Sequence, residues 1–133
     1  MVQVITKEWE IAKIYIYEVV LRDGLIRLDW NDFEMKARES KPVVAVKVDE
    51  PLGISGLTDK AINEVKKNIK GTLSSVMVVI SFKKEHELMM EELGSLNGSL
   101  ACLADENVNI IWGIQQVEDI TNNRSVTVFV FEK

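Results

Sequence analysis

The sequence has few of the side chains that build metal sites and nucleophilic catalysts. Among its 133 residues, Cys102 is the only cysteine and His86 the only histidine. A zinc site built from several such ligands is therefore excluded, as is a Ser-His or Cys-His relay that does not use His86. His86 lies in a polar stretch, so we expect an exposed residue at a helix start. One thiol cannot form an internal disulfide, which favours a reducing compartment, and we expect a cytoplasmic protein.

Glycine and proline are also scarce, with seven and two copies. The glycines are scattered, and neither Gly-x-x-x-x-Gly-Lys-Ser/Thr nor Gly-x-Gly-x-x-Gly occurs, so the chain has no recognisable phosphate-binding loop. We therefore expect no cofactor and no metal. No stretch reaches the ~18 apolar residues that a membrane span needs, and the N-terminus carries charged residues in place of a signal-peptide core. We expect no membrane partner.

The charge balance is acidic, because 21 Asp and Glu residues face 16 Lys and Arg residues and give a formal net charge of −5. A phosphate backbone is bound mainly by clustered Lys and Arg. The short basic runs at 66–67 and 83–84 are diluted by neighbouring carboxylates, so we expect no nucleic-acid partner. At this length, with 47% hydrophobic residues, the chain is expected to bury a core without disulfides.

From residue 42 onward, strand and helix patterns alternate, which is typical of an α+β layer fold. Apolar, β-branched segments predict strands at 43–48, 76–82, 108–114 and 125–131. Apolar residues at three- and four-residue steps predict a helix starting at Thr58 and a second one along the stripe Met89, Leu93, Leu96, Leu100 and Leu103. Helical connections favour parallel pairing of the first three strands, and the last strand, reached by a turn, is expected to be antiparallel. The expected fold is α+β, a two-layer β-α-β-α-β-β sandwich with a mixed four-stranded sheet and the helices on one face.

The first forty residues leave two interpretations open. Trp9, Ala12 and Ile16 fit a helical stripe that is apolar nearly all round. Residues 14–21 are instead rich in β-formers, and Asp23-Gly24 before residues 25–28 is a good hairpin turn, so local chemistry slightly favours a hairpin. Residues 29–34 then indicate a helix start.

Residues 24–33 read Gly-Leu-Ile-Arg-Leu-Asp-Trp-Asn-Asp-Phe. This segment resembles the one that joins the central helix to the C-terminal domain in the FtsZ branch of the tubulin superfamily, where Gly-Leu-Ile/Met-Asn and an aliphatic precede Asp-Phe-Ala-Asp-Val. Residues 58–73 are similar to the family's next helix, and 75–81 to its Gly-Val-Leu-Val-Asn-Ile strand. Residues 109–113 resemble Asn-Ile-Ile-Phe/Trp-Gly, and 124–128 resemble Arg-Val-Thr-Val. The likeness covers about residues 20–133.

The resemblance implies two parts of the chain: an N-terminal helix, acidic loop and short helix in residues 1–40, and an FtsZ C-terminal-like sandwich in residues 41–133. It places the first segment at the end of the family's central helix, and we adopt a helix as the prediction. The family's nucleotide-binding domain has no counterpart here. We therefore expect no enzyme: the chain should neither bind nor hydrolyse GTP by itself.

In the family, carboxylates on the loop after the central helix reach the nucleotide of the neighbouring subunit and orient the attacking water. The resemblance maps these carboxylates onto Asp29 and Asp32, the candidate catalytic residues, which would act only in trans. Both are also well placed to cap and begin a helix, and the two roles are compatible. Arg27 replaces the family's Asn, which weakens the case for intact catalytic geometry.

Three functional hypotheses follow. The first is a non-enzymatic interaction module for cell division that caps or modulates filaments of a full-length FtsZ-like GTPase. The second is the C-terminal domain of a complete FtsZ-like GTPase. The third is a self-associating scaffold or enzyme with chorismate-mutase-like topology, whose sites would form between subunits of a trimer. A helix bearing Trp9, Tyr15 and Tyr17 without its covering domain would expose an apolar patch, so we expect a protein partner or a homo-oligomer.

Overall fold

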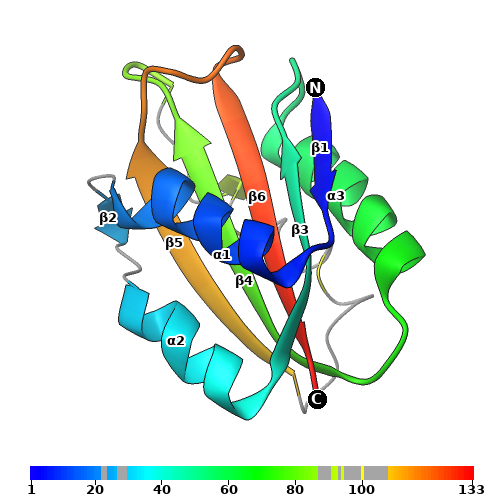
Figure 1. Cartoon of the computed structure of the whole chain (residues 1–133). Helices are drawn as coiled ribbons and strands as arrows, with labels where there is room; N and C mark the ends of the chain where they lie inside the picture. Colours follow the sequence, from blue (N-terminus) through cyan, green and yellow to red (C-terminus); the bar gives the residue numbers. More distant parts are fainter. Residues whose placement is uncertain (22–23, 27–29, 87–90, 93, 95–99, 101–107) are drawn as a thin grey trace.

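The computed structural model shows a six-stranded mixed sheet with helices on both faces (Figure 1). The structure describes residues 1–21, 24–26, 30–86, 91–92, 94, 100 and 108–133. Its strands are β1 (Val2–Ile5), β2 (Gly24–Ile26), β3 (Lys41–Val48), β4 (Leu73–Phe82), β5 (Asn109–Gln116) and β6 (Arg124–Glu132). The helices whose bounds fall within the described residues are α1 (Glu8–Tyr15), the π-helical turn η1 (Ile16–Val20), α2 (Trp30–Glu39) and α3 (Ile54–Asn68).

All four expected strands are present, as β3, β4, β5 and β6, but their pairing differs from the prediction. The strand order is β1-β3-β6-β4-β5-β2. β4 and β5 are parallel, as expected, whereas β6 lies between β3 and β4 and is antiparallel to both. The expected parallel pairing of β3 with β4 is therefore wrong. Residues 125–131 of β6 are all buried. A strand buried along its whole length needs a neighbouring strand on each edge, which a central position in the sheet provides, and packing layers over both faces.

One face of the sheet packs against α3. The valines at alternate positions of β3, β4 and β6 form a core with the apolar side of α3, and Leu100, 1% exposed, joins it. α3 begins at Ile54, one turn before Thr58, so the predicted helix start is wrong. The helix extends backward because Ile54 and Leu57 are buried, at 2% and 0% exposure. The hydroxyl of Thr58 instead donates to the Ile54 carbonyl at 2.8 Å. Apart from Leu100, the predicted stripe from Met89 to Leu103 lies outside the described residues.

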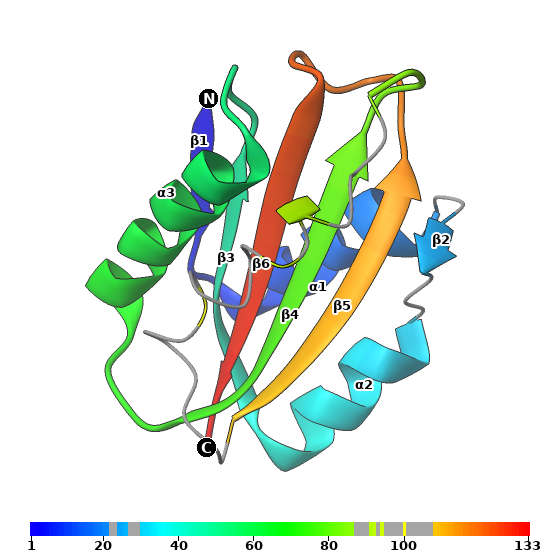
Figure 2. The ribbon, with the colours of Figure 1, turned by 180° about the vertical axis from the view of Figure 1, so that it is seen from behind.

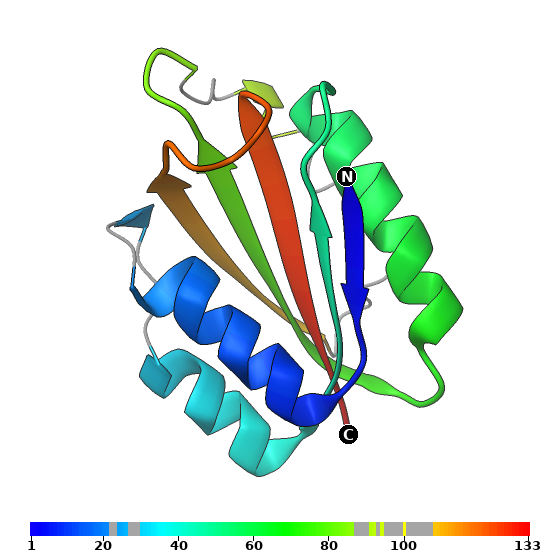
Figure 3. The same ribbon diagram turned by 45° about the horizontal axis from the view of Figure 1, so that its top comes forward.

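The opposite face is covered by α1, η1 and α2, which add a third layer that the predicted two-layer sandwich of residues 41–133 did not include (Figures 2 and 3). Figure 2 shows α3 in front of the sheet, and Figure 3 shows α1 and α2 on the other side. Phe129 and Phe131 point to this second face from β6 and are fully buried. A sheet with large apolar side chains on both faces requires helices on both.

The N-terminal segment is a helix, as the resemblance implied, and the hairpin is not formed. Ile11, Tyr15 and Val19 recur every fourth residue and are at most 3% exposed, so helical periodicity prevails over local β propensity. β1 precedes this helix and pairs antiparallel with β3. This strand was not predicted, because four residues are too few to show a strand period.

Candidate functional site

The strand β2, which comes just before the residues expected to carry catalytic carboxylates, forms one edge of the sheet. β2 pairs antiparallel with β5, with Gly24 opposite Gln115 and Ile26 opposite Ile114, and α2 starts shortly after it. Asp32 is half-buried in the first turn of α2, where the helix dipole favours a carboxylate. Asp29 lies outside the described residues. The structure therefore describes one of the two candidates, at the start of α2.

An aromatic cluster holds α2 against α1 and the sheet. Tyr15 is fully buried, and its ring centroid lies 4.8 Å from that of Phe33 and 5.1 Å from that of Phe129. Phe33 in turn stacks on Trp30 at 5.3 Å and meets Phe131 edge-on at the same separation. Such contacts bury large apolar areas and restrict ring orientation. The start of α2, and with it Asp32, is consequently held on a rigid support.

The outer surface of this helical layer is apolar and exposed. Trp9 is 64% exposed, Tyr17 56% and Leu21 67%. The predicted patch is present for Trp9 and Tyr17 but not for Tyr15, which faces the sheet. Between α1 and α2 this surface is hollowed into a groove of about 430 Å³. The groove is lined by Glu8, Trp9, Ala12, Trp30, Phe33, Glu34, Ala37 and Pro42. A surface of this kind commonly marks a contact with another protein or another part of a longer chain.

Polar contacts tie the π-helical turn η1 to the sheet beneath it. Gln115 donates from Nε2 to the Glu18 carbonyl at 2.7 Å and to the Ser81 hydroxyl at 3.0 Å. The Glu18 carboxylate pairs with the Lys47 ammonium at 3.0 Å. Gln115 is only 4% exposed, so these bonds satisfy a buried amide. They hold η1 in one position on the sheet.

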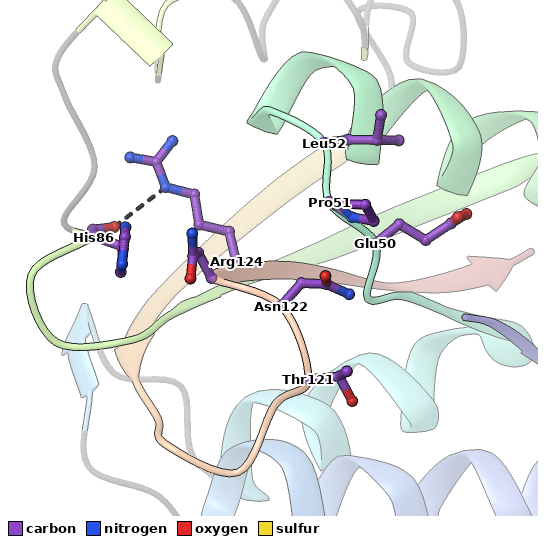
Figure 4. A pocket seen from close by; sticks show the side chains of 8 residues that line it. Glu50, Pro51, Leu52, His86, Thr121, Asn122 and Arg124 are labelled. Atoms are coloured by element: carbon purple, nitrogen blue, oxygen red, sulfur yellow. Dashed lines mark hydrogen bonds between the residues drawn. The ribbon is translucent and has the colours of Figure 1, made fainter.

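A second hollow, of about 360 Å³, lies at the end of the sheet where β3 and β4 finish and β6 begins (Figure 4). Its lining includes Glu50, His86, Asn122 and Arg124, and Figure 4 shows Arg124 turned toward His86. Nε of Arg124 donates to the His86 carbonyl at 3.2 Å, and the guanidinium forms an ion pair with Glu92. His86 is exposed, as predicted.

Asp49 holds the loop residues Thr121 and Asn122 that line one side of this hollow. Its carboxylate accepts the backbone N–H groups of Thr121 and Asn122 at 2.8 and 2.9 Å, and the Asn122 side chain at 3.1 Å. Burial by itself raises the pKa of Asp49, but these hydrogen bonds hold it below its usual value. Hydrogen bonding to Lys60 likewise lowers the pKa of Glu50. Because these charges are engaged with neighbouring groups, the hollow is best explained as structural.

The described part of the chain contains neither a metal-binding cluster nor a membrane span. No group of at least three His, Cys, Asp or Glu side chains in the described ranges could hold a metal ion. None of the helices in that part of the chain is long and apolar enough to cross a membrane.

The fold and the site together define an α+β domain whose sheet has one face under α3 and the other under an apolar, solvent-exposed helical layer. No protein-family model and no curated protein sequence matches the chain. Among solved structures, it is similar to FtsZ from M. jannaschii, described as an empty dimer, with a TM-score of 0.66 and 19% identity over 90% of this chain. A tryptophan-to-tyrosine mutant of that FtsZ matches with a TM-score of 0.56 and 17% identity over 92% of this chain.

These likenesses show that the chain has an FtsZ-like fold, which confirms the resemblance predicted from the sequence. The matches cover 35% and 37% of the two FtsZ chains, so this chain spans about a third of the length of the proteins it resembles.

Proposed function

We propose that the chain is a non-enzymatic FtsZ-like interaction module that caps or modulates filaments of a full-length FtsZ-like GTPase in cell division. The exposed apolar layer of α1, η1 and α2, on an FtsZ-like fold, is the observation that carries the proposal. Such a module offers the loop at residues 24–32 to the nucleotide end of a filament subunit and presents no nucleotide end of its own. Asp32, held at the start of α2, and Asp29 act at most in trans on the partner's nucleotide.

The test adds the purified chain to a polymerising full-length FtsZ-like GTPase from the same cell and follows light scattering and phosphate release. A capping module lowers the scattering at an equimolar ratio. The double variant Asp29→Asn with Asp32→Asn separates capping from catalysis: it still lowers scattering but changes phosphate release per polymerised subunit. Asp59→Asn, an exposed substitution on α3 at the opposite face of the sheet, is the matched control. Unchanged scattering at an equimolar ratio contradicts the proposal.

The coverage of about a third of FtsZ favours a second candidate, in which the chain is the C-terminal domain of a complete FtsZ-like GTPase. The exposed helical layer would then be covered by the rest of that protein. An antibody against the chain distinguishes the two in an extract of the native cell. A band near 15.1 kDa supports the separate module, and a single much larger band supports the domain.

A further inference from the structure

β1 is an edge strand without the usual protection against pairing with another strand. It has β3 as its one neighbour among the described strands and lies at the margin of the sheet (Figure 3). Natural proteins guard such edges with charged side chains, prolines, bulges or a covering element. Val2, Gln3, Val4 and Ile5 carry no charge and no proline, and their register with β3 is regular. α3 packs over β3 and β6, further into the sheet.

The hydrogen bonds at the start of β1 show which backbone groups face away from β3. The Met1 amino group donates to the Asp49 carbonyl at 2.7 Å, and the Asp49 N–H donates to the Met1 carbonyl at 2.9 Å. In an antiparallel ladder such hydrogen-bonded pairs alternate with pairs whose N–H and C=O groups point to the other side. The next pair, Val2 with Val48, and the pair of Val4 with Val46 are therefore of the second kind. The N–H and C=O groups of Val2 and Val4 face outward.

The side chains of β1 divide between the two faces of the sheet. Val2 and Val4 lie on the face of Val46 and Val48, beside α3, and remain 40% and 38% exposed. Gln3 lies on the opposite face and is also exposed. The edge thus shows two valines on one face and a single uncharged amide between them on the other.

We propose that two copies of the chain pair through β1, antiparallel, across a two-fold axis that passes between the two Gln3 residues. Val2 then forms hydrogen-bonded pairs with Val4 of the partner subunit, so every outward N–H and C=O of these residues finds its complement. The valines meet valines beside α3. The Gln3 amide is both donor and acceptor, so it can form a hydrogen bond with Gln3 of the partner subunit. A charged side chain at this position would be repelled by the same charge in the partner subunit.

A proline at position 4 tests the pairing without disturbing β1 and β3. The Val4 N–H does not bond to β3, and proline is tolerated at an edge strand whose N–H faces outward. Val4→Pro removes the hydrogen bond from the Val4 N–H to the partner subunit, and the two-fold symmetry makes this loss occur twice in each dimer. The variant is therefore expected to dimerise about thirtyfold more weakly in sedimentation equilibrium. Val4→Thr keeps the N–H and a β-branched side chain, and it should associate much like the original chain. Equal association of the proline variant and the original chain would overturn the proposal.

Charges at position 3 test the position of the axis. Gln3→Glu and Gln3→Lys should each be predominantly monomeric, and an equimolar mixture should form a heterodimer because opposite charges then meet on the axis. Lys47, opposite Gln3 in β3, is already paired with Glu18. Circular dichroism confirms that both variants are folded. A chain that stays monomeric up to millimolar concentration, a trimer, or variants that dimerise alone as well as mixed would each show that β1 does not pair in this way.

Discussion

Asp49 makes contacts with two distant parts of the chain, the N-terminus and the loop before β6. Its backbone exchanges two hydrogen bonds with Met1, and its carboxylate accepts the N–H groups of Thr121 and Asn122, more than seventy positions away. It is 4% exposed. A buried carboxylate is stable only when donors replace its lost water, and three donors do so here. One side chain thereby holds the loop before β6 against the end of β3.

The lowered pKa of Asp49 makes part of the stability depend on pH. Because the folded-state pKa lies below the usual value of 3.8, the ionised form stabilises the fold fully above that value, and this contribution is lost as the pH falls through the folded-state pKa. Asp49→Asn is expected to lower the free energy of unfolding by about 2 kcal/mol at neutral pH, and by less near pH 3. Urea titrations at the two pH values measure both effects.

Asp59→Asn is the matched control for this change, since Asp59 is exposed on α3. It should leave the unfolding free energy nearly unchanged at both pH values. If Asp49→Asn lowered the free energy of unfolding equally at neutral and acidic pH, the charge of Asp49 would not stabilise the fold.

The element that distinguishes this structure is the helical layer of α1 and η1, whose two sides differ sharply. Tyr15 and Tyr17 are two residues apart, yet Tyr15 is fully buried and Tyr17 is 56% exposed. The buried side packs on Phe129 and Phe33, and the other side faces solvent. Successive helical residues are about 100° apart, so a two-residue step reaches nearly the opposite side of the helix.

Substituting the two tyrosines separately measures this asymmetry, because both changes remove the same atoms from the same helical segment. Tyr15→Ala is expected to cost roughly 3–5 kcal/mol, as truncation of a buried aromatic does. Tyr17→Ala should cost less than about 1 kcal/mol, because an exposed ring adds little to stability. If Tyr15→Ala does not fold, Tyr15→Leu, which retains apolar bulk, supplies an intermediate value. Similar losses at the two positions would mean that Tyr17 is buried in solution, as in an oligomer that covers this layer.

At the scale of the whole molecule, β6 joins the two cores. Val126, Val128 and Val130 face α3, while Phe129 and Phe131 face α1 and α2. Both helical layers therefore depend on the same central strand and its pairing with β3 and β4. A single sheet shared by two cores favours one cooperative unfolding transition.

Adjacent substitutions in β6 test this cooperativity. Val128→Ala is expected to cost about 2 kcal/mol and Phe129→Ala roughly 3–5 kcal/mol. In each variant, tryptophan fluorescence and far-ultraviolet circular dichroism should still report one coincident transition. Lys66→Ala, exposed on α3, is the control. A separate early loss of fluorescence in Phe129→Ala alone would mean that the helical layer of Trp9 and Trp30 unfolds independently.

Much of the fold could be predicted from the sequence because its strongest signals are local. Runs of β-branched residues located β3 to β6. The candidate site was less predictable. Asp32 was placed correctly at a helix start, but the groove beside Trp9 depends on how α1 meets α2, and no spacing in the sequence encodes that contact.

The sequence alone determined that the segments of β3 to β6 form strands, because this property follows from side-chain type, and its motifs in order along the chain indicated the resemblance to FtsZ. Only the tertiary structure decided that β6 lies between β3 and β4, that the helix of residues 8–20 covers the second face, and that β1 completes an edge. Those choices depend on which surfaces cover one another. Phe129 and Phe131 are buried because a helix covers their face of the sheet. The local sequence around residues 8–20 does not show that this face must be covered, since its β propensity favours a strand.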